Sequence, residues 1–305
     1  MNSILGQTFM NFELILIDDG SPDGCGQLCD LYAILDSRVW VIHQENKGSA
    51  GARNVGLQKA RGKYLICVDS DDWVEPDYLE CLYNEAERSG ADVVGCNLVR
   101  EFGKKTVERK NQLPAQPSDC IRGILEGKVQ GWLHVKFLRR SLLVEHEISF
   151  VEDLDLWEDM LFSVKVFAFA KTVSNVTKVL YHYRDNPSSI VNSIDERRIR
   201  EMLSITYQIE DFLSRQGLID EFGCLIPVLQ AQVKLFTIFS PDKQVRKVFR
   251  NEMKWTEDLL YKQPVSMAGK ICIFCYLHNI FWGQTLLINT RLLLKKLLAF
   301  ITRKR

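Results

Sequence analysis

The sequence has no excess of charge of either sign and few histidines. Lysine plus arginine and aspartate plus glutamate each number 39, so the formal net charge is zero and no general attraction to nucleic acid is expected. The five histidines form no evident pair with a serine or cysteine nucleophile. Nucleic-acid binding and covalent catalysis are therefore disfavoured, and any site must come from a local cluster of side chains.

The nine cysteines form no recognisable metal or disulfide pattern. They are scattered, several of them inside apolar runs where a thiol behaves as a small hydrophobic side chain. The one CxxC pair, Cys272 and Cys275, lies in an apolar stretch without a second pair or a nearby histidine pair, so helix packing explains it better than zinc or redox chemistry. Scattered thiols fit a reducing, cytoplasmic compartment.

Short apolar runs alternate with helix-like segments in the first hundred residues. This alternation is typical of an α/β fold with a mostly parallel, Rossmann-like sheet. One helix is expected to begin at Pro76, because proline favours the first helical turn, and to end at Gly90. The expected strands are Glu13–Ile17, Val39–Ile42, Tyr64–Val68 and Asp92–Cys96.

Changes in composition divide the chain into three regions. Residues 1–100 carry the α/β pattern. From 101 to 120 the chain is polar and contains two prolines, which indicates an exposed connection into a second region, 101–195. Residues 196–305 have a helical pattern, so a helical C-terminal region is expected.

An acidic turn, Asp69-Ser70-Asp71-Asp72, directly follows the expected strand Tyr64–Val68. Open α/β sheets bind ligands at the carboxyl ends of their strands. Three carboxylates so close together repel one another unless a hard cation or solvent compensates their charge, and Mg²⁺ or Mn²⁺ held there could bridge a diphosphate. The alternative is a solvated acidic turn that caps the next helix.

A second acidic turn, Asp18-Asp19-Gly20-Ser21, follows the strand Glu13–Ile17 and should open on the same edge of the sheet. A carboxylate there can accept the N–H of a nucleobase, and Gly20 permits close approach of a ligand. Between the two turns, Arg53 supplies a planar cation suited to phosphate. The alternatives are a simple turn with a helix cap and a surface arginine on an amphipathic helix.

These motifs belong to a longer series of motifs, and both their order along the chain and their spacing carry information. The series comprises Gln7-Thr8, Phe12 to Ser21, Asn46-Lys47-Gly48, Ala52-Arg53-Asn54, Asp69 to Trp73, Trp132, Lys136, Arg139-Arg140-Ser141, Trp157 to Phe162, Tyr181 to Arg184 and Ser189. Through it the chain resembles family-two inverting glycosyltransferases of bacterial capsular and exopolysaccharide synthesis. The resemblance is strong over residues 3–98, is looser to about 192, and fades in the C-terminal third.

The resemblance implies a GT-A fold, a nucleotide-sugar donor and roles for individual residues. Asp159 takes the place of the general base, which removes the proton of the acceptor hydroxyl as it attacks; without the resemblance, Glu158 and Asp159 would be interpreted as acids at a helix N-terminus. Asp69 and Asp71 are the expected metal ligands, and Asp18, Asp19, Arg53 and Asp69 the expected donor contacts. Weaker candidates are Asp72, Trp132, Lys136, Trp157, Glu158 and Arg184, the two tryptophans for sugar stacking and the two cations for phosphate or acceptor.

The expected function is transfer of a sugar, from a UDP-sugar, to a hydroxyl of a lipid-linked glycan in cell-surface polysaccharide synthesis. One alternative is a nucleotidyltransferase, although its early glycine-rich phosphate loop with arginine and lysine is not visible. Another is an inactive remnant that serves as a nucleotide-binding scaffold. Release of pyrophosphate would identify the first, and turnover of any donor would exclude the second.

The C-terminal third is expected to hold the protein on the inner face of the cell membrane. No acidic residue follows Asp258, and apolar runs at Ile271–Tyr276 and Leu292–Ile301 are interleaved with cations. The alternative is a helix packed on the catalytic core. The cations are Lys262, Lys270, Arg291, Lys295, Lys296, Arg303, Lys304 and Arg305.

The resembled family begins with an apolar strand and a helix that lead into a segment like Ser3–Thr8, whereas this chain starts inside that helix. An absent first strand should leave neighbouring strand edges unpaired and an apolar face open. Weak nucleotide binding and low solubility are therefore expected, and an extension upstream by roughly 25 residues, one strand-plus-helix unit, is expected to restore both.

Overall fold

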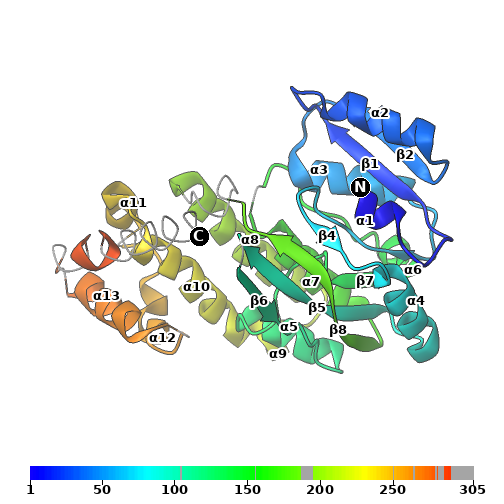
Figure 1. The fold of residues 1–305 in the computed structure, drawn as a ribbon. Coiled ribbons are helices and arrows are strands. Elements are labelled where there is room, and N and C mark those ends of the chain that lie inside the picture. The colour runs from blue at the N-terminus through cyan, green and yellow to red at the C-terminus, as the bar shows by residue number, and fades with distance from the viewer. Residues whose placement is uncertain are drawn as a thin grey trace. The chain divides into compact units, whose positions relative to one another are not determined.

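The computed structural model describes residues 1–103, 105–154, 156–186, 195–249, 251–263, 265–278, 280 and 285–289. The chain forms two compact units (Figure 1), which are described one at a time. The first unit comprises Met1–Ile124 and Val129–Asp185, and the second comprises Leu125–Lys128 and Asn186–Arg305. Most of the first two regions expected from the sequence therefore fold within one unit.

A pair of parallel strands opens the first unit. Strand β1 (Leu14–Asp19) pairs with β2 (Val39–Gln44) along its whole length, and α2 (Cys25–Leu35) connects them, as a parallel pair requires. Helix α3 (Gly48–Lys59) follows β2 and packs against β1 (Figure 1). Both expected strands are present, and β1 ends at the acidic pair of the first turn.

A second sheet of six strands forms the rest of the unit, in the order β3-β7-β5-β8-β4 with β6 paired to β5. The expected parallel pairing holds for β5 with β8, whereas the other pairs of this sheet are antiparallel, so the sheet is mixed. Connectivity permits this, because β6 is joined to β5 by a hairpin, which makes them antiparallel, and only parallel neighbours require a crossover connection. The strands are β3 (Tyr64–Leu65), β4 (Trp73–Val74), β5 (Val93–Phe102), β6 (Lys105–Arg109), β7 (Lys136–Arg139) and β8 (Val173–Arg184).

The two sheets are not joined through the residues that the structure describes. There β1 pairs only with β2, and β3 pairs only with β7 over two residues, so the expected strand Tyr64–Val68 is cut short after Leu65. The apolar side chains of β1 remain partly exposed. The absent first strand stays a prediction.

The main core of the first unit lies between the mixed sheet and α4 (Tyr78–Ser89). Fully buried Tyr78 and Leu82 of α4 belong to one apolar cluster with Val94, Leu98 and Tyr181 of the sheet. The helix ends at Gly90 with a φ of +68°, as expected from the sequence. The remaining helices of this unit are α1 (Asn2–Leu5), α5 (Pro117–Leu125, whose last residue belongs to the second unit), α6 (Arg140–Glu145) and α7 (Glu158–Phe169).

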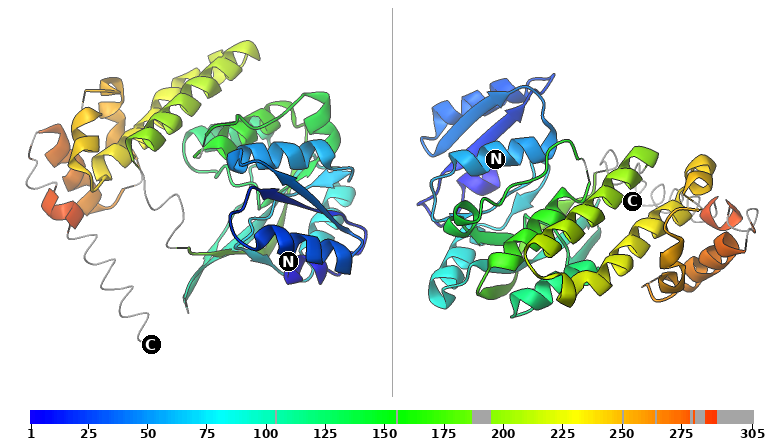
Figure 2. Two further views of the ribbon diagram at one scale, coloured as in Figure 1. Left: turned by 90° about the horizontal axis from the view of Figure 1, so that it is seen from above. Right: turned by 180° about the vertical axis from the view of Figure 1, so that it is seen from behind.

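The second unit is helical, as expected from the sequence. Helix α10 packs along α8 and contacts α11, α12 and α13 (Figure 2). The stretch Ile219–Phe239 is long and apolar enough to cross a membrane, but half of its most apolar window is buried inside the unit, as in the core helix of a soluble protein. The elements are α8 (Glu196–Arg215), α9 (Ile219–Phe222), η2 (Gly223–Leu225), α10 (Ile226–Phe239), α11 (Lys243–Val248), η3 (Lys254–Thr256), α12 (Glu257–Leu260) and α13 (Met267–Leu277).

Candidate active site

Arg53 joins two of the acidic motifs. From α3 its guanidinium donates hydrogen bonds to Glu158 Oε1 at 2.6 Å and to Asp69 Oδ1 at 3.3 Å. Ser49, one turn earlier on α3, also donates to Glu158 Oε1 at 3.3 Å. Burial alone would lower the pKa of Arg53, but the surrounding acids, Asp69 and Glu158 among them, raise it above its usual value. The arginine is therefore a permanent cation between the acidic turn and the start of α7.

The acidic turn that ends with Asp72 is fixed by the last residues of β8. The Tyr181 hydroxyl accepts the Asp69 N–H at 3.2 Å and donates to Asp72 Oδ2 at 2.6 Å, and the Arg184 N–H donates to Asp72 Oδ1 at 2.8 Å. Burial raises the pKa of Asp72 although these hydrogen bonds oppose the shift. Asp71 and the Arg184 side chain are exposed. The sequence-predicted Asp72 and Arg184 thus meet through the Arg184 main chain.

Asp69 lies between two basic side chains. Its Oδ2 is 3.4 Å from His134 Nδ1, and its Oδ1 receives the Arg53 hydrogen bond. Burial alone would raise the pKa of Asp69, but His134 and Arg53 lower it to about 2. This carboxylate is therefore ionised throughout the physiological range.

Asp159 stands in the first turn of α7, next to the buried Glu158. Trp157 precedes the helix with a φ of +67°, a conformation that few residues of its size adopt. Gly131 packs so closely on this turn that a β-carbon there would be 2.9 Å from Met160 N. Within the part of the chain that the structure describes, the Asp159 carboxylate makes no hydrogen bond, which is compatible with the general-base role predicted from the sequence.

Lys136 hydrogen-bonds to the loop 130–132, which packs against the first turn of α7. Its ammonium donates to the carbonyl oxygens of Gln130 at 2.7 Å and Trp132 at 2.6 Å, and its side chain is 1% exposed. Burial lowers the pKa of Lys136 to about 8 although the Asp159 charge opposes the shift. Trp132 itself is partly buried against the main core. These contacts favour a supporting role for Lys136 over direct contact with phosphate.

The first acidic turn has partners of its own. Asp19 Oδ1 accepts hydrogen bonds from Gln44 Nε2 at 2.6 Å and from the Lys47 N–H at 2.9 Å, just before α3. Asp18 accepts from His43 Nδ1 at 2.8 Å and from the Ser21 N–H at 3.1 Å, and these contacts lower its pKa. Asp19 thereby fixes the start of the helix that carries the arginine of the site.

The donor set of the second acidic turn suits a hard divalent cation. Asp69 and Asp71 offer carboxylate oxygens two residues apart, and the residues that the structure describes contain no group of three or more His, Cys, Asp or Glu side chains that would enclose a metal alone. Mg²⁺ typically takes one or two carboxylates and completes its coordination with water and substrate phosphate. The residues therefore fit a metal that is shared with a phosphate ligand.

The sequence did not single out His134, and it named Tyr181 only as part of a motif. His134 lies within the apolar stretch Trp132–Phe137, where a histidine is easily taken for a core residue. Its contact with Asp69 arises only when β7 and β8 flank β5. No local pattern signals that contact.

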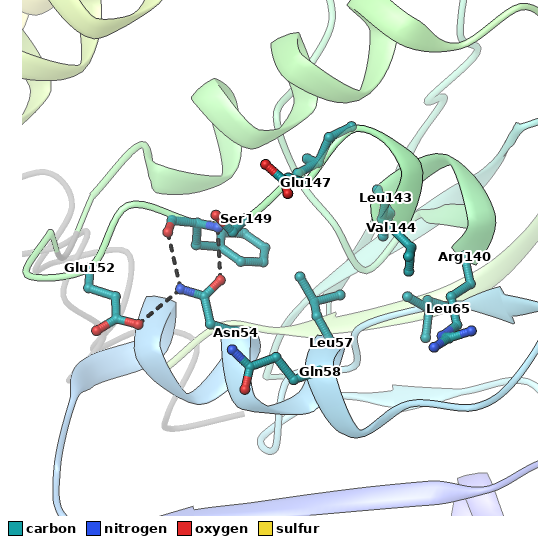
Figure 3. Close-up of a pocket in the computed structure, with 12 residues that line it drawn as sticks. Asn54, Leu57, Gln58, Leu65, Arg140, Leu143, Val144, Glu147, Ser149 and Glu152 are labelled. Atoms are coloured by element: carbon teal, nitrogen blue, oxygen red, sulfur yellow. Dashed lines mark hydrogen bonds between the residues drawn. The ribbon is translucent and has the colours of Figure 1, made fainter.

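A pocket of about 520 Å³ is lined by residues of α3, β3 and α6 and of the segment 147–152 that follows α6 (Figure 3). Asn54 on α3 forms one wall, with hydrogen bonds to the main chain of Phe150 and to Glu152. Arg140 lines the pocket, and its Nε is buried without a hydrogen-bond partner among the described residues. None of the sequence-predicted site residues lines this pocket, so the cluster around Arg53, and not the pocket, is the candidate active site.

Residues 1–151 match the model of the family described as Glycosyl transferase family 2. The chain is 37% identical to EpsH of Bacillus subtilis (strain 168) over 73% of this chain and 66% of EpsH, and 29% identical to the succinoglycan biosynthesis protein ExoO of Rhizobium meliloti (strain 1021) over 64% of this chain and 59% of ExoO. It thus spans less than two thirds of the length of either relative. Residues 1–349 of S. aureus TarS, solved in complex with UDP-GlcNAc, have a similar fold, with a TM-score of 0.66 at 20% identity over 95% of this chain and 86% of that chain.

Proposed function

Because the chain belongs to glycosyl transferase family 2, we propose that it transfers a sugar from a nucleotide-sugar donor to a hydroxyl group, with inversion at the anomeric carbon. The observation that carries the proposal is the double contact of Arg53, which unites the acidic turn at Asp69 with the first turn of α7 at Glu158. The resemblance gives donor binding to Asp69 and the catalytic base to Asp159, the residue next to Glu158. We further propose a UDP-sugar as donor, on the support of the UDP-GlcNAc bound to the fold neighbour TarS.

On the donor side, Arg53 faces the negative charge of a diphosphate. Its planar guanidinium can exchange a carboxylate partner for phosphate oxygens without losing hydrogen bonds. Asp69 and Asp71 would hold Mg²⁺ or Mn²⁺, and the bound ion would neutralise charge on the leaving diphosphate. Asp18, at the end of β1, is the proposed contact for the nucleobase, and Asp19 orients the loop before α3.

On the acceptor side, Asp159 is the proposed base. Its carboxylate accepts the proton of the acceptor hydroxyl while the hydroxyl oxygen bonds to the anomeric carbon and the bond to the diphosphate breaks. One displacement of this kind inverts the anomeric configuration and needs no covalent intermediate. Trp157, two residues before Asp159, and Trp132 are proposed to pack on a sugar ring.

The proposed acceptor is a lipid-linked glycan of cell-surface polysaccharide synthesis. The name of the relative ExoO, a succinoglycan biosynthesis protein, supports this setting. A cytoplasmic enzyme that uses such an acceptor would work at the inner face of the membrane. The second unit offers support on α13, where Met267, Ile271 and Phe274 are exposed at i, i+4 and i+7, with Lys270 exposed beside them. The predicted segment Leu292–Ile301 lies outside the described residues.

Thermal shift with a panel of nucleotides and nucleotide sugars, with Mg²⁺ or Mn²⁺, tests the donor, because a ligand that binds only the folded state raises the unfolding midpoint by mass action. A UDP-sugar should raise it most. Turnover with an acceptor glycan should then release nucleoside diphosphate. Release of pyrophosphate would instead identify a nucleotidyltransferase, and binding without turnover of any donor would identify a nucleotide-binding scaffold.

A further inference from the structure

His134 is a buried histidine with one nitrogen beside the acidic turn and the other without a partner. The residue is 7% exposed, and its ring stacks on Tyr181 with centroids 4.3 Å apart. Nδ1 lies 3.4 Å from Asp69 Oδ2, whereas Nε2 is buried and has no hydrogen-bond partner among the described residues. A buried polar atom without a partner costs stability, so phenylalanine would fill a purely apolar packing position better. The imidazole therefore has a polar role, and its polar neighbour is Asp69.

Tyr181, on which the His134 ring stacks, hydrogen-bonds to the same acidic turn. It is fully buried, and its single hydroxyl accepts the Asp69 N–H while donating to Asp72 Oδ2. Burial, together with the nearby charges of Asp69 and Asp72, raises the pKa of Tyr181, which keeps the hydroxyl protonated and able to donate. The stacked pair thus fixes one main-chain amide and two carboxylates of a four-residue turn.

We propose that His134 and Tyr181 are positioning residues that hold the turn Asp69–Asp72 in the conformation that accepts a divalent cation with a nucleoside diphosphate. The inference rests on the proposed function. Three carboxylates within four residues repel one another and would spread apart in solvent. The hydrogen-bond donors that His134 and Tyr181 direct at Asp69 and Asp72 keep these carboxylates in place before a ligand binds. Hydrogen-bond partners of this kind orient metal ligands in other proteins. In this arrangement His134 donates from Nδ1 to Asp69, and Tyr181 fixes the backbone.

Replacement of each ring separates the polar contacts from the packing. His134→Asn keeps a donor near the Nδ1 position, His134→Gln places its amide near the Nε2 position, and His134→Phe keeps the stacked ring alone. Tyr181→Phe keeps its ring and removes two hydrogen bonds. The probe is Mn²⁺ in the presence of UDP, with free Mn²⁺ measured by electron paramagnetic resonance. His134→Phe, His134→Gln and Tyr181→Phe should each weaken Mn²⁺ binding about 10-fold or more, and His134→Asn should retain most of it.

His146→Phe is the matched control, because His146 also stacks on an aromatic ring, that of Phe169 at 4.0 Å, and is not part of the acidic turn. Wild-type Mn²⁺ affinity in both His134→Phe and Tyr181→Phe would overturn the inference, as would equal losses in His134→Asn and His134→Gln. If His134→Phe does not fold, Tyr181→Phe and the Asn/Gln comparison still decide. If the wild-type protein binds neither Mn²⁺ with UDP nor any nucleotide-sugar donor, the proposed function itself is refuted. If the wild-type protein binds these ligands and the variants bind them equally well, only the positioning role is refuted.

Discussion

Arg53 and Glu158 are 105 residues apart in the sequence, yet Arg53 Nη1 lies 2.6 Å from Glu158 Oε1. The side chains are 22% and 9% exposed, so this is a largely buried ion pair. It ties α3 to the first turn of α7 and places the proposed base, Asp159, in the electrostatic field of the arginine. The proposed donor site and the proposed base therefore share one cation.

Replacement of Arg53 should cost both stability and activity. Arg53→Ala leaves Glu158 buried without its cation, and loss of one partner from a buried pair destabilises by about 3 kcal/mol. Arg53→Lys should recover part of the stability but little turnover, because a single ammonium cannot reproduce the fork that contacts Glu158 and Asp69 together. Denaturant unfolding and initial rates measure the two effects.

Arg215→Ala is the control, since Arg215 pairs with Asp211 on α8 and the two side chains are 73% and 56% exposed. An exposed pair contributes little, so this variant should stay within about 1 kcal/mol of wild type. Equal losses in the Arg53 and Arg215 variants would contradict a special role for the buried pair.

The sequence predicted β1 and β2 to within two residues at each end, because apolar runs bounded by turn residues are a local signal. The acidic turns and Arg53 were found for the same reason. The shortened β3 was not predictable, since a ladder depends on a neighbouring strand and the described residues supply none beside Ile66–Val68. Nor was the contact of His134 with Asp69, which requires β7 and β8 to meet the acidic turn in space.

Asp159→Asn should separate binding from chemistry. The amide keeps the size of the side chain but accepts no proton, so turnover should fall about 10²–10⁴-fold while donor affinity changes little. Isothermal titration with donor and steady-state rates give the two quantities. Asp119→Asn is the matched control, because Asp119 is an exposed acid in the first turn of another helix, α5. An unchanged rate in Asp159→Asn would place the base elsewhere.

Asp71→Asn should abolish metal-dependent turnover. The substitution removes one of two carboxylates that would share the ion with the diphosphate, and the remaining Asp69 is already engaged by Arg53 and His134. Rates measured across a Mn²⁺ titration test this, with Ser70→Ala on the same exposed turn expected to behave as wild type. Full activity of Asp71→Asn in the presence of a chelator would show that the metal assignment is wrong.

Lys136 should give the stability a distinctive dependence on pH. Its pKa is about 8 in the folded protein against a usual value of 10.5, so between these pH values the unfolded chain binds a proton that the folded chain has released. The free energy of unfolding therefore rises with pH in this window, by roughly 3 kcal/mol in total. Lys136→Met removes this contribution.

Urea unfolding of wild type and Lys136→Met from pH 7 to 10.5 measures the difference directly. The free energy of unfolding of the wild type should increase relative to that of the variant as the pH rises. The variant's missing hydrogen bonds to Gln130 and Trp132 add a loss of stability that does not depend on pH. Lys128→Met, at a lysine whose side chain is 73% exposed, should show no such trend. A constant difference across the window would mean that Lys136 is not buried as a neutral amine at high pH.

Membrane attachment should depend on the exposed face of α13. Ile271 and Phe274 are each 47% exposed, and the sequence after Asp258 contains cations but no acid, so an anionic bilayer is the complementary surface. The wild type should sediment with vesicles that contain anionic lipid at low salt, and less so as salt screens the attraction. The double variant Ile271→Glu/Phe274→Glu should abolish sedimentation, since each change adds a negative charge and removes apolar area.

The control is Ile34→Glu, at an 82% exposed apolar residue of α2, which should have no effect on sedimentation. If the wild type does not sediment with anionic vesicles at low salt, α13 is not a membrane surface. If the Ile271→Glu/Phe274→Glu double variant sediments like the wild type, attachment lies elsewhere in the chain.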